Sequence, residues 1–171
     1  GVVETNKGTI NSCFATGKVT VRGIANANYQ RNGYAGGLVG TNDSNGTIKN
    51  CYAQLSIVVT TNISATSGDY RVVVGGLVAV NAGLIGNSWV VIANGYATLT
   101  KSAENTECVI NAFVGKNTTT YSQEGYTYGI KNCYQYIDGG ANSGGISQMD
   151  SVASMMTEAF KKTLNTNAGK D

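Results

Sequence analysis

The sequence predicts an all-β fold, a parallel β-helix (solenoid) of about four repeats covered by a C-terminal α-helix as a cap. Three observations lead to this prediction: a phrase that recurs along the chain, a composition suited to short strands, and a change to helical spacing near the C-terminus. The 171 residues include 23 glycines and no proline. Because Gly and Asn tolerate left-handed backbone conformations, this composition favours short strands joined by tight corners over helical bundles.

The recurring phrase is clearest at residues 36–53, which read GGLVGTN, a short turn and GTIKNCYA. It occurs four times, twice in degraded form, and its landmark asparagines at 6, 42, 81 and 117 are 36, 39 and 36 residues apart. A fixed period in this range indicates a solenoid, a propeller or an array. The residues that define the repeat are Gly36, Gly37, Leu38, Gly40, Asn42, Ile48, Asn50, Cys51, Gly76, Leu77, Asn81, Ile85, Asn117, Ile130, Asn132 and Cys133.

Equivalent positions of the repeat have expected structural roles. The glycine pairs let the chain turn a corner or pack closely. The asparagines at 42, 81 and 117 should close a short strand, where they can adopt φ > 0 and bond to nearby backbone, and they can form an amide ladder if the copies stack. The apolar side chains expected at one point of each coil are Leu38, Leu77 and Phe113, and those expected to begin the next strand pointing inward are Ile10, Ile48, Ile85 and Ile130.

A second set of asparagines is expected to bend the strand that the inward isoleucines begin. The bend would return the small residue after each asparagine to the core, and then Ala15 or Ala53. The aromatic residue in between would stay outside, whereas simple alternation would invert this facing. The asparagines are Asn50, Asn87 and Asn132, with Asn11 one residue off in the first copy. The aromatic file is Phe14, Tyr52, Trp89 and Tyr134.

Runs rich in β-formers follow each phrase, for example at residues 18–21, 56–60 and 70–74, so each repeat should hold three or four short strands. A β-propeller has a similar period. The β-helix is favoured because identical residues at equivalent positions suit ladders between stacked copies. The period of 36–39 residues is long for one plain coil, so part of each repeat should project as a hairpin or arm.

Three of the four cysteines, Cys13, Cys51 and Cys133, hold one repeat position, where the third copy has Ser88. Cys108 lies in the strand before the fourth copy. The spacing fits no zinc pattern of close pairs. A stack of buried free thiols is the favoured interpretation. The alternatives are a disulfide between neighbouring coils, since stacked strands lie about 4.8 Å apart, and a metal or catalytic thiol.

The chain divides into repeats over 1–138, a glycine-rich connection over 139–147, and a C-terminal helix and tail over 148–171, all in one domain. Residues 147–150 resemble a capping box, and apolar residues at helical spacing predict a helix from about 148 to 164. Its apolar face should cover the end or side of the solenoid, with partner binding as the alternative. Because the chain opens inside a copy, it is expected to be a piece of a longer protein.

The repeat resembles the GLUG repeat, named for its Gly-Leu-any-Gly core. Residues 37–40 match that core in full, residues 76–79 and 112–115 depart at one or two positions, and the resemblance covers roughly residues 1–138. Such repeats occur in large bacterial surface and secreted proteins, including IgA-specific metallopeptidases and haemagglutinin-like adhesins. The resemblance implies an extracellular or cell-surface stalk or adhesin-like module, whose partners are adjacent repeats or domains and host glycans or proteins.

The residues predict no enzyme. Without histidine, the Ser-His-Asp, Cys-His and HExxH arrangements are excluded. The acids are scattered, and Glu104 and Glu107 are the one close pair before the tail, in an expected loop. We therefore predict no catalytic residue, no metal ligand and no cofactor. The alternatives are a carbohydrate-active β-helix enzyme with carboxylates gathered across coils, and a scaffold domain of a secreted peptidase.

The charge balance also limits the partners. A net charge of +2, with 13% charged residues, does not favour nucleic acid or an anionic membrane, and no apolar run reaches the ~18 residues of a membrane helix. Tyrosine is a common contact residue at interfaces. The candidate ligand contacts are loop or strand-end tyrosines, which could instead simply cover the corners: Tyr29, Tyr34, Tyr121, Tyr126 and Tyr128.

Overall fold

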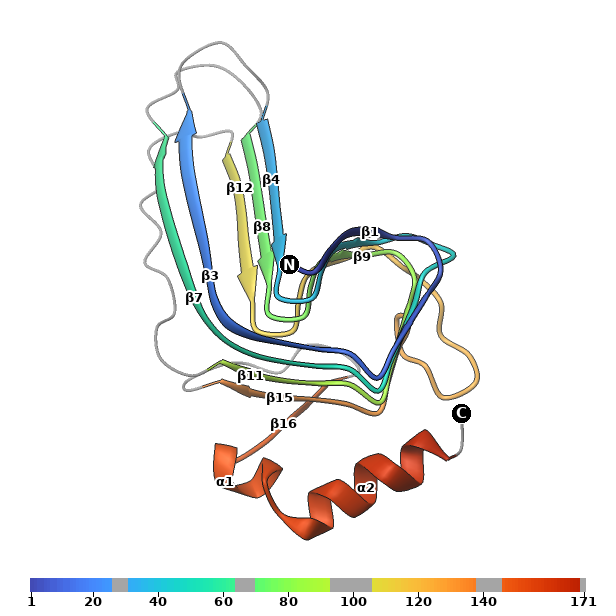
Figure 1. The fold of residues 1–171 in the computed structure, drawn as a ribbon. Coiled ribbons are helices and arrows are strands. Elements are labelled where there is room, and N and C mark those ends of the chain that lie inside the picture. The colour runs from blue at the N-terminus through green and yellow to red at the C-terminus, as the bar shows by residue number, and fades with distance from the viewer. Residues whose placement is uncertain (26–30, 64–69, 93–105, 138–145, 170–171) are drawn as a thin grey trace.

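The computed structural model describes residues 1–25, 31–63, 70–92, 106–137 and 146–169. Over these residues the chain is mostly β, with parallel sheets followed by two short helices (Figure 1). Copy 1 of the repeat supplies strands β1–β3, copy 2 supplies β4–β7, copy 3 supplies β8–β11 and copy 4 supplies β12–β15. These four copies are the units to which the rest of the description refers.

Each sheet takes one strand from each of several successive copies, and sheet C also takes β16, which follows copy 4. Sheet A contains β1 (Val3–Asn6), β5 (Val39–Asn42), β9 (Val78–Asn81) and β13 (Val114–Asn117). Sheet B contains β2 (Thr9–Asn11), β6 (Thr47–Lys49), β10 (Leu84–Gly86) and β14 (Ile130–Lys131). Sheet C contains β3 (Phe14–Ala25), β7 (Tyr52–Ile63), β11 (Trp89–Ile92), β15 (Cys133–Ile137) and β16 (Ile146–Gln148). Sheet D contains β4 (Arg31–Gly36), β8 (Tyr70–Gly75) and β12 (Thr106–Asn111). In a propeller each repeat would instead form its own antiparallel sheet.

The register places equivalent residues of the repeat side by side. In sheet A, Asn42 lies opposite both Asn6 and Asn81. In sheet B, Ile48 lies opposite both Ile10 and Ile85. The predicted alignment of the copies is therefore confirmed. A slip of one residue would turn every side chain of a strand to the other face, so the buried positions fix this register.

The longest strands form an arm. In Figure 1, β3 and β7 curve away from sheets A and B, and β4, β8 and β12 run back beside them. Ile57 and Val59 of β7 and Val74 of β8 belong to one core cluster, so sheets C and D pack face to face along the arm. Part of each repeat thus projects, as the length of the period predicts.

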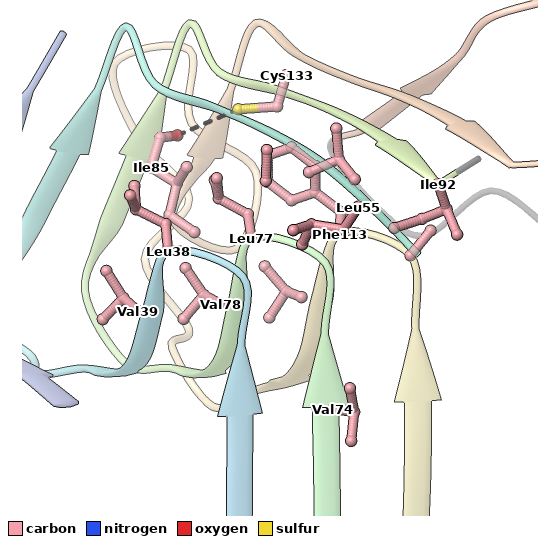
Figure 2. Packing of buried hydrophobic residues seen from close by; sticks show 14 of the residues in the cluster. Leu38, Val39, Leu55, Val74, Leu77, Val78, Ile85, Ile92, Phe113 and Cys133 are labelled. Atoms are coloured by element: carbon pink, nitrogen blue, oxygen red, sulfur yellow. Dashed lines mark hydrogen bonds between the residues drawn. The ribbon is translucent and has the colours of Figure 1, made fainter. Parts of the chain in front are cut away.

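The core is made by the apolar positions of the repeat. Leu38, Leu77 and Phe113 lie in a row at the same point of three successive copies, and each is at most 1% exposed (Figure 2). Val39 and Val78 form a second row beside them (Figure 2). The inward isoleucines are also confirmed, because those at 48, 85 and 130 are at most 2% exposed.

The C-terminal segment differs from the single helix predicted over 148–164. It contains α1 (Val152–Met155) and α2 (Glu158–Ala168). The second helix has an N-cap of its own, since the Thr157 hydroxyl accepts a hydrogen bond from the Phe160 amide at 3.1 Å. A capping residue supplies an acceptor for orphaned N–H groups, so a strong cap inside the periodic stretch divides it into two helices.

The predicted start of the helix is also wrong, because the helix cap lies at another residue. Ser147 and Gln148 belong to β16, which pairs with Tyr134 and Gln135 of β15. The observed capping box is formed by Ser151 and Ser154, four residues later than predicted. Of the connection predicted over 139–147, residues 146 and 147 are thus strand, and the rest lies outside the described residues.

The helices cover the side of the stack, as predicted. Met155 and Phe160 are 6% exposed and pack with Val91 on the outer face of sheet C. The Phe160 ring meets the rings of Trp89 and Tyr134 edge-on, at centroid distances of 6.5 and 5.1 Å. The apolar face of the C-terminal segment is therefore used within the chain.

Candidate functional site

The asparagines of sheet A form a ladder through three copies and into the fourth. The Asn6 amide donates to Asn42 Oδ1 at 2.8 Å, Asn42 donates to Asn81 Oδ1 at 2.8 Å, and Asn81 donates to Asn117 Oδ1 at 2.9 Å. Asn42 and Asn81 are fully buried. Each also donates to a carbonyl of the following turn, at Gly46 and Gly83. Buried amides need such partners, so this ladder is a structural element of the stack.

The predicted ladder is confirmed, but the predicted positive φ belongs to another position. At the bend that follows sheet B, the residues in the left-handed region are Ser12, Asn50, Asn87 and Asn132, with φ between 45° and 54°. Asn42, Asn81 and Asn117 instead end regular strands, where a positive φ would break the pairing. In the first copy the bend falls on Ser12, one residue after Asn11, which matches the offset in the sequence alignment.

A second amide ladder joins the bends. The Asn87 amide donates to Asn50 Oδ1 at 2.6 Å, and the Asn50 amide donates to Asn11 Oδ1 at 2.9 Å. The Asn87 amide also donates to the Leu164 carbonyl of α2 at 3.0 Å, which fixes that helix to the third copy. Asparagine is the non-glycine residue that best tolerates left-handed backbone, so the repeat uses it for both the bend and the ladder.

The small residue after each bend closes the corner. The Cys51 thiol donates to the Lys49 carbonyl at 2.9 Å, and Ser88 Oγ donates to the Gly86 carbonyl at 2.8 Å. The Cys51 backbone N–H in turn donates to Ser88 Oγ of the next copy at 3.2 Å. This shared role explains why cysteine and serine exchange at the position.

The cysteines match the predicted thiol stack except at its first member. Cys51 and Cys133 are buried, and the Cys133 thiol donates to the Ile85 carbonyl at 3.7 Å (Figure 2). Cys13 is exposed, because β2 and β3 are the first strands of their sheets and no described strand lies beyond them. Cys13 and Cys51 are both free thiols, and the side chain of Cys108 lies outside the described residues.

These positions predict selective thiol labelling. Cys13 should react with a thiol reagent in the native protein, whereas Cys51 should react only after unfolding. Burial raises the pKa of the Cys51 thiol, which lowers its reactive thiolate fraction further. Peptide mass spectrometry after a short alkylation would measure both sites. Labelling of Cys51 at the rate of Cys13 would contradict the described stack.

One aromatic residue follows the small residue in each copy, and these aromatic side chains form a file on the outer face of sheet C. Tyr52 stacks between Phe14 and Trp89, with centroid distances of 5.1 and 4.3 Å and interplanar angles of 7° and 2°. Ala53 between bend and arm is fully buried, so the predicted facing is confirmed. Tyr134 continues the register beside Trp89 and packs against Phe160. Because the rings cover one another's faces, the file is not a flat platform for a sugar ring.

A loop at residues 118–129 holds three of the candidate tyrosines. Tyr121 and Tyr126 meet edge to face at 5.9 Å, and Lys131 Nζ lies 5.6 Å from the centre of the Tyr126 ring. Tyr128 is 54% exposed. Partial desolvation and the neighbouring Glu124 carboxylate raise the pKa of the Tyr121 phenol, so it stays a neutral hydrogen-bonding group.

The backbone of this loop is fixed in place. Glu124, Gly125, Tyr128 and Gly129 all have positive φ, which is uncommon for the two that carry side chains. The Asn117 amide donates to the Tyr128 carbonyl at 2.8 Å, so the end of the sheet A ladder anchors the loop. The sequence shows the glycines at 125 and 129 but gives no sign that this loop caps the ladder.

The other two candidate tyrosines lie elsewhere. Tyr34 is 44% exposed on β4, at the opposite end of the sheets from copy 4. Tyr29 lies outside the described residues. The structure therefore brings Tyr121 and Tyr126 together, adds Tyr128 on the same loop, and separates Tyr34 from them.

The acids do not gather in the part of the chain that the structure describes. No group of three His, Cys, Asp or Glu side chains in those ranges could hold a metal ion. Glu107 belongs to β12, not to a loop as predicted, and Glu104 lies outside the described ranges. None of the described helices is long and apolar enough to cross a membrane.

Residues 31–58 match a protein-family model. This stretch is a GLUG motif. The GLUG motif begins with β4 of sheet D, contains β5 and β6, and ends within β7 of sheet C, so it is one strand from each of the four sheets. Searches of the curated proteins and of the solved structures returned no significant match.

Proposed function

We propose that the chain is a non-catalytic β-helical module of a larger bacterial cell-surface or secreted protein, where it serves as a stalk that displays neighbouring domains. The observation that carries this proposal is the use of the repeated side chains. Asn42, Ile48 and Cys51 of the GLUG motif are buried and bonded or packed against the equivalent residues of the neighbouring copies. A repeat whose shared side chains face one another specifies a stack, and each added copy lengthens it.

The β-helical part of the proposal is supported by the pairing pattern. Sheets A, B and C each run in parallel from copy 1 to copy 4, and the chain passes through them in the same order in every copy. Such a stack has one strand spacing of about 4.8 Å per copy, so its length grows in small, regular steps. Its partners are the adjacent repeats or domains of the same protein, and its place is the cell surface or the extracellular space. Nucleic-acid binding and membrane insertion are not part of the proposal.

Surface display tests the stalk. A small binding domain would be anchored to cells or beads in three ways. It would be joined through this chain, joined with no spacer, or joined through an unrelated rigid spacer of equal length. We expect capture of a large, surface-bound target to fall when the chain is deleted and to be restored by the unrelated spacer. Equal capture without any spacer would contradict the stalk.

The tyrosine loop favours a second candidate function, adhesion to host glycans or proteins. Tyr128 is exposed, and its backbone has a positive φ. The same loop holds the Tyr121–Tyr126 ring pair, and the Lys131 ammonium group lies over the Tyr126 ring. Tyrosine offers a large contact area and a hydroxyl at a small cost in conformational entropy, so it is enriched at binding surfaces.

A binding screen separates the two functions. If the loop is adhesive, Tyr128→Ala should weaken a saturable hit on immobilised glycans or extracellular proteins by tenfold or more, about 1.4 kcal/mol. Tyr34→Ala is the matched control, because Tyr34 is also an exposed tyrosine and lies on another part of the surface. Equal losses in both variants would show that the loop is not the binding site. A screen without hits on folded protein would remove the adhesive function and leave the stalk.

A further inference from the structure

Cys13 and Cys51 lie opposite each other in copies 1 and 2. Phe14 and Tyr52, which follow them directly, are register partners in sheet C, and their rings stack at 5.1 Å with an interplanar angle of 7°. The Tyr52 backbone N–H donates to the Cys13 carbonyl at 3.1 Å. Opposed Cα atoms of stacked strands are about 4.8 Å apart, within the range of about 4.4–6.8 Å that disulfides accept. The register therefore holds the two cysteines within bridging range.

The Cys51 thiol leans toward copy 1. Cys51 Sγ accepts a hydrogen bond from the Cys13 backbone N–H at 3.4 Å and donates to the Ile10 carbonyl at 3.7 Å, in addition to its bond within copy 2. Its sulfur thus lies against the backbone of copy 1. Burial is the largest cause that raises the pKa of the Cys51 thiol, and the nearby Cys13 sulfur raises it as well. The two sulfurs are therefore close enough to interact electrostatically.

No other two cysteines at this repeat position are neighbours. The equivalent of Cys51 in copy 3 is Ser88, whose hydroxyl makes the same corner bond but cannot form a disulfide. Cys133 has Ser88 on one side and Ile146 of β16 on the other. The junction of copies 1 and 2 is thus the one place where this position brings two thiols together.

Neither thiol makes a hydrogen bond that the stack cannot replace. The Cys13 thiol donates to the Asn11 carbonyl at 3.3 Å, and Asn11 is an exposed residue, so water can take the place of the thiol. The Cys51 thiol donates to the Lys49 carbonyl at 2.9 Å, but the Ser12 backbone N–H also donates to that oxygen, at 3.1 Å. Both carbonyls therefore keep a partner after the thiols lose their protons, and thiols are weak donors in any case.

We propose that Cys13 and Cys51 are a redox pair that closes to a disulfide between copies 1 and 2, with a low-molecular-weight disulfide as the oxidant. The bridge ties two neighbouring coils together at the corner that precedes β3 and β7. It fixes their register by a covalent bond where the rest of the stack relies on hydrogen bonds and packing. The inference depends on neither the stalk nor the adhesive function.

Closure takes two thiol–disulfide exchange steps. Cys13, the exposed thiol, loses its proton, and its sulfur attacks one sulfur of the small disulfide. This forms a mixed disulfide and releases one small thiolate. Cys51 then loses its proton, and its sulfur attacks Cys13 Sγ, which forms the bridge and releases the second small thiolate. The two cysteines together lose two electrons and two protons, and the small disulfide is reduced to two thiols.

The test measures closure in glutathione buffers. Changing Cys108 and Cys133 to serine leaves Cys13 and Cys51 as the only thiols, and serine already holds the position of Cys133 in copy 3. The reduced protein would be equilibrated with mixtures of oxidised and reduced glutathione, folded or unfolded in urea, and then quenched with acid. Mass spectrometry of tryptic peptides would quantify the bridge, because lysines between the two cysteines place them in different peptides.

We expect the equilibrium constant for closure to be about tenfold or more higher in the folded protein than in urea. The reason is that the fold keeps the two sulfurs at a higher effective concentration than the flexible chain does. Should the serine variant not fold, the unmodified chain mapped for the same two peptides supplies the measurement.

The matched control changes Cys51 and Cys108 to serine and keeps Cys133, so that the two thiols lie in copies 1 and 4. It should carry glutathione at Cys13 and form no bridge. Three results on folded protein would overturn the proposal: Cys51 that stays reduced while Cys13 carries glutathione, a closure constant no higher than in urea, or a disulfide that joins Cys13 of two molecules. Equal bridging in the control would overturn it as well.

Discussion

Phe113→Ala is expected to destabilise the chain by about 3–5 kcal/mol, the usual cost of removing a fully buried aromatic side chain. Phe113 is 0% exposed and continues the row of Leu38 and Leu77 into the last copy (Figure 2). The cavity would lie between backbones held by parallel pairing on several sides, so it can collapse only partly. Equilibrium denaturation with urea would measure the loss.

Phe14→Ala is the matched control for that substitution. Phe14 is the same residue type in the same stack, but it is 60% exposed. We expect its replacement to cost about 1 kcal/mol, through the lost ring contact with Tyr52. Similar losses at 113 and 14 would mean that the row of large apolar residues is not the core.

Asn81→Ala is expected to cost about 2–4 kcal/mol. The substitution removes two ladder bonds in the buried interior, one from the Asn42 amide and one to Asn117 Oδ1. It also leaves the Gly83 carbonyl without its side-chain donor. Each buried polar group without a partner costs about 1–3 kcal/mol, and Asn42 keeps its bonds to the Gly46 and Leu84 carbonyls, which limits the total.

Asn117→Ala supplies the comparison at the end of the ladder. Asn117 is exposed, so water can replace its bonds and we expect a loss of about 1 kcal/mol or less. Both losses would be measured by thermal unfolding followed by circular dichroism. If Asn81→Ala were as mild as Asn117→Ala, the ladder would be a consequence of the stacking and not a support for it.

Most of the stacking could be read from the sequence because each copy repeats the same side chains. Asn42 and Asn81 hold equivalent positions in two copies, so they lie opposite each other when the copies stack in register. Ile48 and Ile85 then show which side of the next strand points inward. The offset of Asn11 in the first copy even anticipates where the bend falls, at Ser12. Repetition here supplies long-range information that a single copy lacks.

What the sequence could not supply concerns segments that occur once. The helical spacing after Met149 does not reveal that Thr157 caps a second helix, because capping depends on one hydroxyl and not on periodicity. Ser147 and Gln148 form a strand because β15 offers an open edge beside them. Tyr121 and Tyr126 meet because of the shape of their loop, which depends on single residues with positive φ. Since no repeated pattern in the sequence marks these residues, the sequence does not predict the contact.

The central claim is that the copies stack in parallel and in register, and disulfide trapping tests it most directly. Thr16 and Gln54 are exposed and lie opposite each other in sheet C, whereas Ser56 lies two residues along from Gln54. In a background with the native cysteines changed to serine, Thr16→Cys should form a disulfide with Gln54→Cys and not with Ser56→Cys. The reason is that Cα atoms of opposed residues in stacked strands are about 5 Å apart, within disulfide range, and those two residues further are not. Equal trapping of the two pairs, or trapping with Ser56→Cys alone, would contradict the register and with it the stack.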